Sequence, residues 1–248
     1  MRIFAHYFRI KWIMSCLLHI ETSTNVCSVA VSHDGTIIYE KEDFSGPNHA
    51  EKLGIFVDEA LSFIDNSLIS LDGVAVSSGP GSYTGLRIGV SMAKGICYGR
   101  DAKLISVPTL QLLCVPVLLG EKVPEAADGL GEPLLCPMLD ARRMEVYAGL
   151  WNRALKPVRE VGADIVTAET YREFLDKHPV YFFGNGAAKC METINHPNAH
   201  LIPDVNPIAR YMMPLAERRF NDGMTEDVAY FTPSYLKDYV AKLPKKLL

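Results

Sequence analysis

The chain has 248 residues, of which 48% are hydrophobic and 22% charged, and its formal net charge at pH 7 is -4. This length suffices for one large domain or for two lobes of about 100 residues each, and the composition is that of a globular protein. An acidic balance without a basic stripe argues against independent nucleic-acid binding, and every apolar run falls short of the ~20 residues of a membrane span.

The first residues, 1–13, are basic and aromatic and precede a short apolar run that ends at Glu21. That run is too short for a signal peptide, so we interpret these residues as an N-terminal extension with Met14 as a natural start. The 6 cysteines lack the CxxC spacing of zinc or redox sites. We expect them to be reduced core residues in a cytoplasmic protein.

Three short strands are expected first, over 16–20, 26–32 and 36–39. The last two flank the hairpin signal Asp34-Gly35, which predicts an antiparallel start. A helix is then expected over 49–64, because apolar residues recur there at helical spacing.

A strand over 74–76 leads into a glycine-rich turn and a helix over 84–98. A strand over 104–107 follows, and the next helix begins at Pro108, which suits a first helical turn. The segment 120–133 is rich in glycine and proline and is expected to be a loop.

In the second half, strands are expected over 134–139, 145–151 and 180–183, and helices over 168–177 and 208–221. A hairpin followed by alternating strands and helices predicts an α/β fold with mixed sheets flanked by helices. The unit of strand, glycine turn and helix occurs twice, which favours two similar lobes.

The glycine-rich turn is a candidate phosphate-binding loop, because backbone N–H groups at a helix N-terminus can bind an anion. The residues concerned are Gly79, Gly81, Ser82, Tyr83 and Thr84. Their spacing differs from that of a Rossmann fingerprint, a P-loop and a nucleophile elbow. We therefore interpret Ser82 as a helix cap rather than a nucleophile.

Four glycines in the following helix form two i,i+4 pairs, namely Gly85 with Gly89 and Gly95 with Gly99. Each interior glycine costs about 1 kcal/mol relative to alanine, so something should pack closely against this backbone. Tight packing on the protein's own sheet and a groove for a helix of a partner chain explain the pattern equally well.

Four segments together resemble the TsaB (YeaZ) family. They are 18–24 with 28–30, 79–89 with 93–95, 105–110, and 140–147, in the order and at the spacing of that family. The resemblance covers nearly everything after Met14. It implies a two-lobed actin-like (ASKHA) fold, with a first lobe over 14–107 and a second over 108–248. The helix near 208–221 is expected to pack back on the first lobe.

The resemblance also implies a function. TsaB is similar to the catalytic subunit TsaD, pairs with it through helices of the first lobe, and acts with the ATPase TsaE to install threonylcarbamoyl on the adenosine next to the tRNA anticodon. The chain is then a non-catalytic subunit that meets tRNA only through the complex and forms a homodimer when alone. It binds no cofactor by itself, whereas ATP or ADP would bind at the interface with its partner.

Mapped onto this sequence, the pairing surface lies on the helices at 49–64 and 84–98. The residues expected there are His49, Leu53, Phe56, Val57, Ala60, Gly85, Ile88, Gly89, Met92 and Gly95. One departure from the family pattern is Glu21, which stands where the first strand commonly ends in Asp. In actin-like ATPases an acidic group at this place helps to organise metal and phosphates.

The main alternative is a metal- or ATP-dependent enzyme of the glycoprotease-like or actin-like ATPase class. TsaD-like proteins carry a His-x-x-x-His pair that can chelate one ion from one helix face. Here His49 is followed at i+4 by Leu53, so we expect no metal site and interpret His49 as a surface or capping residue.

The segment with Asp140, Arg142 and Arg143 leaves two interpretations. These residues would either orient a substrate or touch phosphate in the assembled complex, or form a hairpin corner with local ion pairs to Glu145. Such ion pairs are worth at most about 1 kcal/mol when exposed. We favour the structural interpretation.

Overall fold

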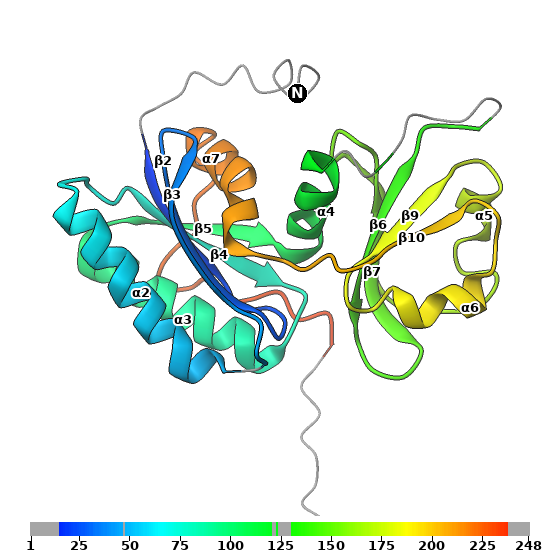
Figure 1. The fold of residues 1–248 in the computed structure, drawn as a ribbon, viewed down its shortest axis with the longest axis horizontal. Helices are drawn as coiled ribbons and strands as arrows, with labels where there is room; N and C mark the ends of the chain where they lie inside the picture. The colour runs from blue at the N-terminus through cyan, green and yellow to red at the C-terminus, as the bar shows by residue number, and fades with distance from the viewer. Residues whose placement is uncertain (1–14, 47, 121–122, 124–129, 238–248) are drawn as a thin grey trace, which may run out of the picture.

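The computed structural model describes residues 15–46, 48–120, 123 and 130–237. It contains two five-stranded sheets, one in each of two lobes (Figure 1). The expected extension at 1–13 and most of the expected loop at 120–133 lie outside the described residues. No helix within the described part of the chain has the length and apolar character needed to cross a membrane.

The first sheet has the strand order β3-β2-β1-β4-β5. Its strands are β1 (Cys16–Glu21), β2 (Cys27–His33), β3 (Thr36–Asp43), β4 (Gly73–Gly79) and β5 (Lys103–Pro108). The first three strands pair antiparallel, while β4 pairs parallel with β1 and β5 parallel with β4. The expected antiparallel start is confirmed, and the parallel strands extend it into a mixed sheet.

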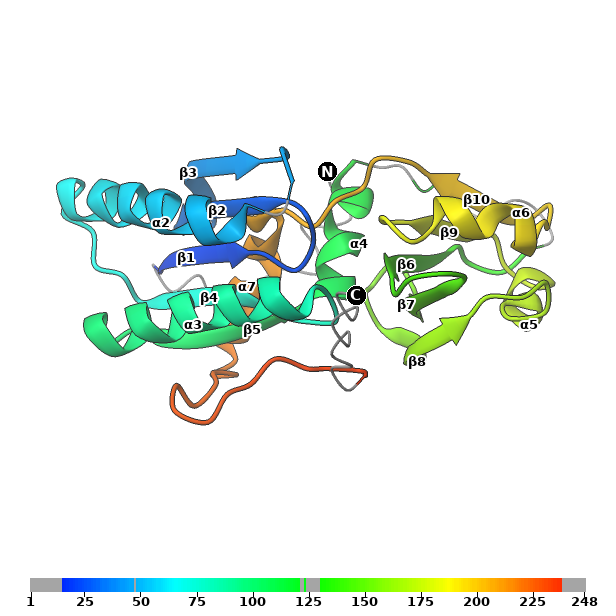
Figure 2. The same cartoon turned by 90° about the horizontal axis from the view of Figure 1, so that it is seen from below.

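Helices cover both faces of this sheet. On one face lie α2 (His49–Asn66) and α3 (Tyr83–Arg100), which run side by side (Figure 2). Alternate residues of β1 face opposite ways, since Leu18 belongs to the core beneath α2 and α3 and Leu17 to a cluster with Met212 on the other face. Because both faces of the sheet are covered, all 6 residues of β1 are buried, including His19 and Glu21.

The second sheet has the order β10-β9-β6-β7-β8. Its strands are β6 (Leu134–Asp140), β7 (Glu145–Trp151), β8 (Pro157–Ile165), β9 (Val180–Phe183) and β10 (Ala199–Ile202). The short helices α5 (Arg172–Leu175), η1 (Ala188–Cys190) and α6 (Met191–Ile194) lie on one side of it.

The helix α4 (Thr109–Leu119) lies between the two sheets (Figure 1). Leu113 packs with residues of the second sheet such as Phe183, whereas Leu112 packs with Leu17 and Ile105 of the first. A helix enclosed on both sides must be apolar all round, which is the character of this segment.

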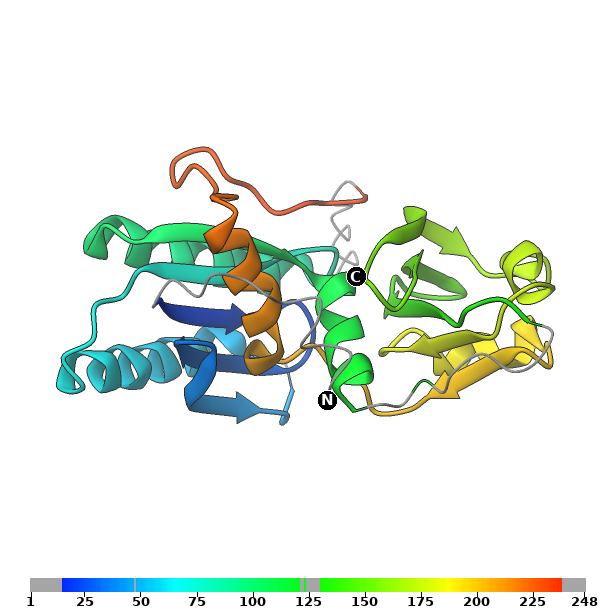
Figure 3. The same cartoon turned by 90° about the horizontal axis from the view of Figure 1, so that it is seen from above.

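The chain then returns to the first lobe through η2 (Ala209–Met212) and α7 (Met213–Asn221), which cross the sheet face opposite α2 and α3 (Figure 3). A buried polar network fixes this return. Glu217 accepts hydrogen bonds from Ser15 Oγ at 2.6 Å and Ser32 Oγ at 3.3 Å, and His19 Nε2 lies 2.8 Å from Ser32 Oγ. Burial lowers the pKa of His19 to about 3, so its ring is neutral.

The last described segment, 222–237, runs along the edge of the first lobe and reaches the second. The backbone of Glu226 donates to Leu104 O at 2.8 Å, and that of Ser234 donates to Ser78 O at 2.7 Å. Lys237 then forms an ion pair with Glu145 at the start of β7. The segment therefore links the two lobes.

Several sequence-based expectations differ from the structure. The helix expected over 168–177 is one turn, α5, and the helix expected over 208–221 begins as a 3-10 turn. The edge strands β8 and β10 were not expected. Both are exposed along much of their length, so neither shows the apolar pattern of a buried strand.

Candidate functional site

The first glycine pair of α3 packs against the protein's own sheet. The side chain of Ser82 accepts a hydrogen bond from Gly85 N at 3.2 Å, which confirms it as the N-cap. A Cβ atom at Gly85 would overlap Thr22 O, and one at Gly89 would overlap Thr22 Oγ1. These two glycines let the helix approach the turn after β1.

The second glycine pair faces outward. A Cβ atom at Gly95 or Gly99 would meet nothing within 4 Å. Both glycines line a shallow groove of about 740 Å³ between α2 and α3, which we call the α2–α3 groove. Its other lining residues are Leu61, Ile88, Met92 and Ile96, which are apolar, and Arg87, Ser91 and Arg100. The first pair therefore confirms close packing on the protein's own chain, whereas a partner helix at the second pair stays a prediction.

The residues expected at a pairing surface divide in the same way. Gly95 is exposed and Phe56, Ile88 and Met92 are half-buried, so their atoms reach the surface of α2 and α3. The others are buried within the lobe: His49, Leu53, Val57, Ala60, Gly85 and Gly89. These buried residues support the surface from beneath, and the assignment of an interface to α2 and α3 stays a prediction.

Six residues of the groove were not predicted as part of the surface, namely Leu61, Arg87, Ser91, Ile96, Gly99 and Arg100. The signal for one of them was present, because Gly99 stands four residues after Gly95 and shares its helix face. At the far end of the groove the Arg100 guanidinium donates two hydrogen bonds to Asp65, at 2.5 and 2.8 Å, and ties α3 to α2.

The glycine-rich turn before α3 is covered by the chain itself. A Cβ atom at Gly79 would lie 2.5 Å from Ser234 O, and one at Gly81 would lie 2.5 Å from Ser23 O. The N–H of Ser82 donates to Ser23 O at 2.7 Å. The glycines are thus explained by close packing of protein backbone, and phosphate binding by this turn stays a prediction.

Next to this turn Glu21 is fully buried at the end of β1. Its Oε1 accepts a hydrogen bond from Ser23 N at 2.5 Å, and burial raises its pKa to about 7. The carboxyl group is therefore enclosed by the turn rather than presented to a ligand. Such a group holds a proton near neutral pH more readily than it would organise a cation.

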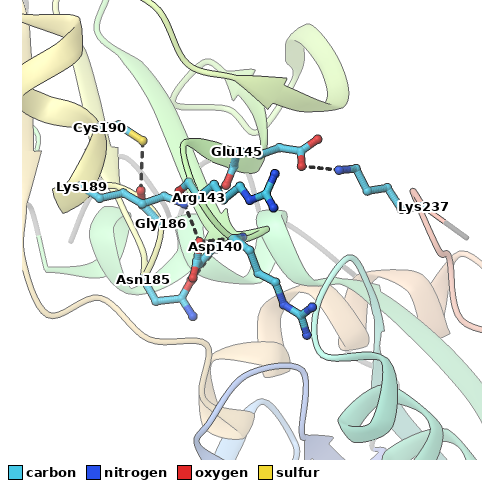
Figure 4. Close-up of polar contacts among 9 residues, drawn as sticks. Asp140, Arg143, Glu145, Asn185, Gly186, Lys189, Cys190 and Lys237 are labelled. Atoms are coloured by element: carbon cyan, nitrogen blue, oxygen red, sulfur yellow. Dashed lines mark hydrogen bonds and ion pairs between the residues drawn. The ribbon is translucent and has the colours of Figure 1, made fainter. Parts of the chain in front are cut away.

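Lys189 stabilises the turn between β6 and β7 through hydrogen bonds (Figure 4). Its Nζ donates to Asp140 Oδ1 at 2.5 Å, to Arg143 O at 2.5 Å and to Glu145 O at 2.8 Å, which uses all its donors. Asp140 Oδ1 also accepts from Arg142 N at 2.9 Å. These bonds favour the structural interpretation of Asp140.

The ion pairs expected between the two arginines and Glu145 are wrong. Glu145 pairs with Lys237 instead, from the opposite side of the turn (Figure 4). Within the described part of the chain, Arg142 and Arg143 have no ion-pair partner. Both side chains are exposed.

Comparison with known proteins decides the family. The family model for TsaD, tRNA N6-adenosine threonylcarbamoyltransferase, matches residues 43–245. The tRNA threonylcarbamoyladenosine biosynthesis protein TsaB of Bacillus subtilis (strain 168) is 31% identical over 173 residues, which cover 68% of this chain and 70% of that protein. The chain belongs to the TsaB family. The TsaB of Escherichia coli (strain K12) is 28% identical over 238 residues, or 93% of this chain and 99% of that protein.

A solved structure has the same fold as this TsaB-family chain. YeaZ from Pseudomonas aeruginosa superposes with a TM-score of 0.71 at 22% identity, covering 90% of this chain and 100% of its own. Together with the two mixed sheets, this confirms the expected two-lobed actin-like (ASKHA) α/β fold.

The histidine considered as a metal ligand is buried in this TsaB-family structure. His49 begins α2, is 5% exposed, and its Nε2 lies 2.7 Å from Thr24 O. His49 was expected to be a surface or capping residue, and the surface alternative is wrong. The N-cap of α2 is Asn48, and the His49 imidazole instead ties α2 to the turn after β1. The described residues contain no group of three or more His, Cys, Asp or Glu placed to hold a metal ion.

Proposed function

We propose that this chain is a non-catalytic subunit that activates TsaD, and that TsaD and TsaE together with it threonylcarbamoylate the tRNA adenosine next to the anticodon. In this proposal the chain acts in the cytoplasm and meets tRNA only within the complex. The names of its TsaB relatives support a role in tRNA threonylcarbamoyladenosine biosynthesis. The match to the TsaD family model supports TsaD as the partner.

The α2–α3 groove carries the proposal. Gly95 and Gly99 have no packing reason inside the lobe, although each costs about 1 kcal/mol in a helix. A close-approaching helix of another chain would supply that reason, because small residues let two backbones approach each other. The half-buried Ile88 and Met92 would then become fully buried, and each buried apolar side chain adds to the association free energy.

The non-catalytic role is supported by the region where an actin-like ATPase binds nucleotide. Glu21 is buried with a raised pKa, and the glycine turn is covered by Ser23 and Ser234. Neither feature suits a metal-phosphate complex held by this chain alone. We therefore place ATP or ADP at the interface with the partner, where residues of both chains would contribute.

The test is size-exclusion chromatography with light scattering of the chain mixed with TsaD of the same organism. We expect a heterodimer for the wild type and for Ile165→Trp, a control that adds a tryptophan at a position of the second lobe that is 71% exposed. Gly95→Trp places a large ring in the groove at a position where a Cβ atom would meet nothing within 4 Å, and we expect at least a tenfold weaker complex.

Two other outcomes would contradict this proposal in different ways. If Gly95→Trp and Ile165→Trp bind TsaD equally well, the interface with TsaD lies outside the groove. No association of the wild type, with or without nucleotide, would overturn the proposal, and metal content and ATP hydrolysis of the chain would then test the enzyme alternative.

The same experiment on the chain alone tests self-pairing. An apolar groove left open on a monomer favours pairing with a second copy through the same surface. We expect the mass of a homodimer for the wild type and of a monomer for Gly95→Trp at micromolar concentration. A monomeric wild type would contradict this.

A further inference from the structure

The β6–β7 turn carries two positive charges that its neighbours do not neutralise. The carboxylates at the two ends of the turn are both paired, Asp140 with Lys189 and Glu145 with Lys237. Both lysines come from distant parts of the chain. Because these lysines neutralise the two carboxylates, Arg142 and Arg143 give the turn a local excess of positive charge, although the net charge of the protein is -4.

Six of the ten arginines in the described residues form an ion pair with a carboxylate. Arg100 pairs with Asp65, Arg159 with Asp164, and Arg210 with Glu42. Among the described residues Arg87 and Arg153 form no ion pair either, but each stands alone, whereas Arg142 and Arg143 are adjacent in the sequence and both exposed. An exposed cluster of like charge is attracted to an oppositely charged ligand.

The backbone of the turn adds to this contrast. Arg142 has φ 76° and Arg143 has φ 51°, both in the left-handed region that Gly and Asn adopt most easily. Placing longer side chains there costs about 1 kcal/mol or more per residue. The bonds from Lys189 Nζ to Arg143 O and from Arg142 N to Asp140 hold the turn in this conformation. These hydrogen bonds therefore fix the backbone from which the two exposed arginine side chains extend.

We propose that Arg142 and Arg143 bind phosphodiester groups of the tRNA backbone in the assembled complex, an inference that rests on the proposed function. A guanidinium group donates two parallel hydrogen bonds to a phosphate and keeps its charge at every physiological pH. The pair adds two phosphate contacts to those supplied by the partner. The acidic balance of the whole chain keeps such a site weak until the complex forms.

The experiment measures tRNA affinity of the complete complex with TsaD and TsaE over a range of salt concentrations. The test variant is Arg142→Asn with Arg143→Asn, because asparagine tolerates the left-handed backbone and removes both charges. The control is Arg153→Asn with Lys156→Asn. These exposed residues lie beyond the other end of the seven-residue strand β7, about 20 Å away at ~3.3 Å per residue.

We expect the test variant to reduce the slope of log affinity against log salt by about 1.4 to 1.8, since each phosphate contact contributes about 0.7 to 0.9. Its affinity should fall about tenfold or more at low salt, whereas the control changes little. Light scattering of the complex before tRNA is added reports pairing with TsaD separately. Loss of pairing in the wild type would overturn the proposed function, and intact pairing isolates the inference about tRNA.

Several results would overturn the phosphodiester site. They are an unchanged slope in the test variant, an equal loss in the control, and a wild-type affinity that does not depend on salt. Normal tRNA binding with weakened ATP or ADP binding would assign the arginines to a free nucleotide and would also overturn it.

Discussion

The two halves of α3 use the same residue type for opposite purposes. In the N-terminal half, Gly85 and Gly89 press against Thr22, and a side chain at either position would collide with it. In the C-terminal half, Gly95 and Gly99 face an open groove where a side chain would meet nothing. The first pair is required by the fold of this chain, whereas the second pair is not.

This difference teaches that a glycine pattern by itself does not say what packs against it. Replacing a glycine that the fold requires with alanine should lower the free energy of unfolding of the protein. Replacing a glycine that serves contact with another chain should instead raise the free energy of unfolding of the isolated protein. Substitutions at the buried and at the open glycines therefore distinguish these two cases.

The largest effect is expected at Gly85. A Cβ atom there overlaps the backbone oxygen of Thr22, and the hydrogen bond from Thr22 Oγ1 to Gly85 O, 2.8 Å long, would be displaced. Gly85→Ala should lower the free energy of unfolding by about 3 kcal/mol, measured by urea denaturation. The control is Gly54→Ala in α2, where a Cβ meets nothing within 4 Å. Equal stability of the two variants would contradict the buried half of the comparison.

Next to Thr22, the buried Glu21 should make stability depend on pH. Its pKa is about 7 in the folded protein, compared with an ordinary value of 4.5, so the folded state binds the proton more tightly. Stability is therefore complete below about pH 4.5 and is lost as the pH rises through 7, by about 3 kcal/mol in total. Glu21→Gln cannot ionise and should remove this fall, measured as urea midpoints from pH 4.5 to 8. A wild type whose stability changes no more than that of Glu21→Gln over this range would show that the carboxyl is not enclosed.

The smallest effect is expected at the open end, and it has the opposite sign. Gly95→Ala and Gly99→Ala should each raise the free energy of unfolding of the isolated chain by up to about 1 kcal/mol, because alanine favours the helix and no atom obstructs it. Urea denaturation beside Gly54→Ala measures this gain. If Gly95→Ala instead destabilises the chain to the extent of Gly85→Ala, the two halves of α3 do not differ.

Much of the fold was predicted from the sequence where the signal is local. The strands of the first sheet, the cap at Ser82 and the start of α2 at His49 follow from neighbouring residues. The edge strands β8 and β10 escaped prediction because their sequences are largely polar or exposed. Such strands are defined by hydrogen bonds to a neighbour in the sheet rather than by burial of an apolar face.

The candidate sites were predicted only in part for a related reason. The sequence indicated α2 and α3 as a surface and the pair Arg142 and Arg143 as a charged corner. It could not indicate which lysine neutralises which carboxylate, because Lys189 lies 49 residues from Asp140 along the chain. Such distances depend on the packing of whole elements.

The sequence by itself determined the family, the α/β class and the presence of a glycine-lined helix, because these follow from motifs and periodicity within short segments. Only the tertiary structure decided that Gly85 and Gly89 face Thr22 while Gly95 and Gly99 face outward. It also decided that Glu21 is enclosed. The physical reason is that close contact and burial arise between residues far apart in the chain, such as Thr22 and Gly85, which are 63 positions apart.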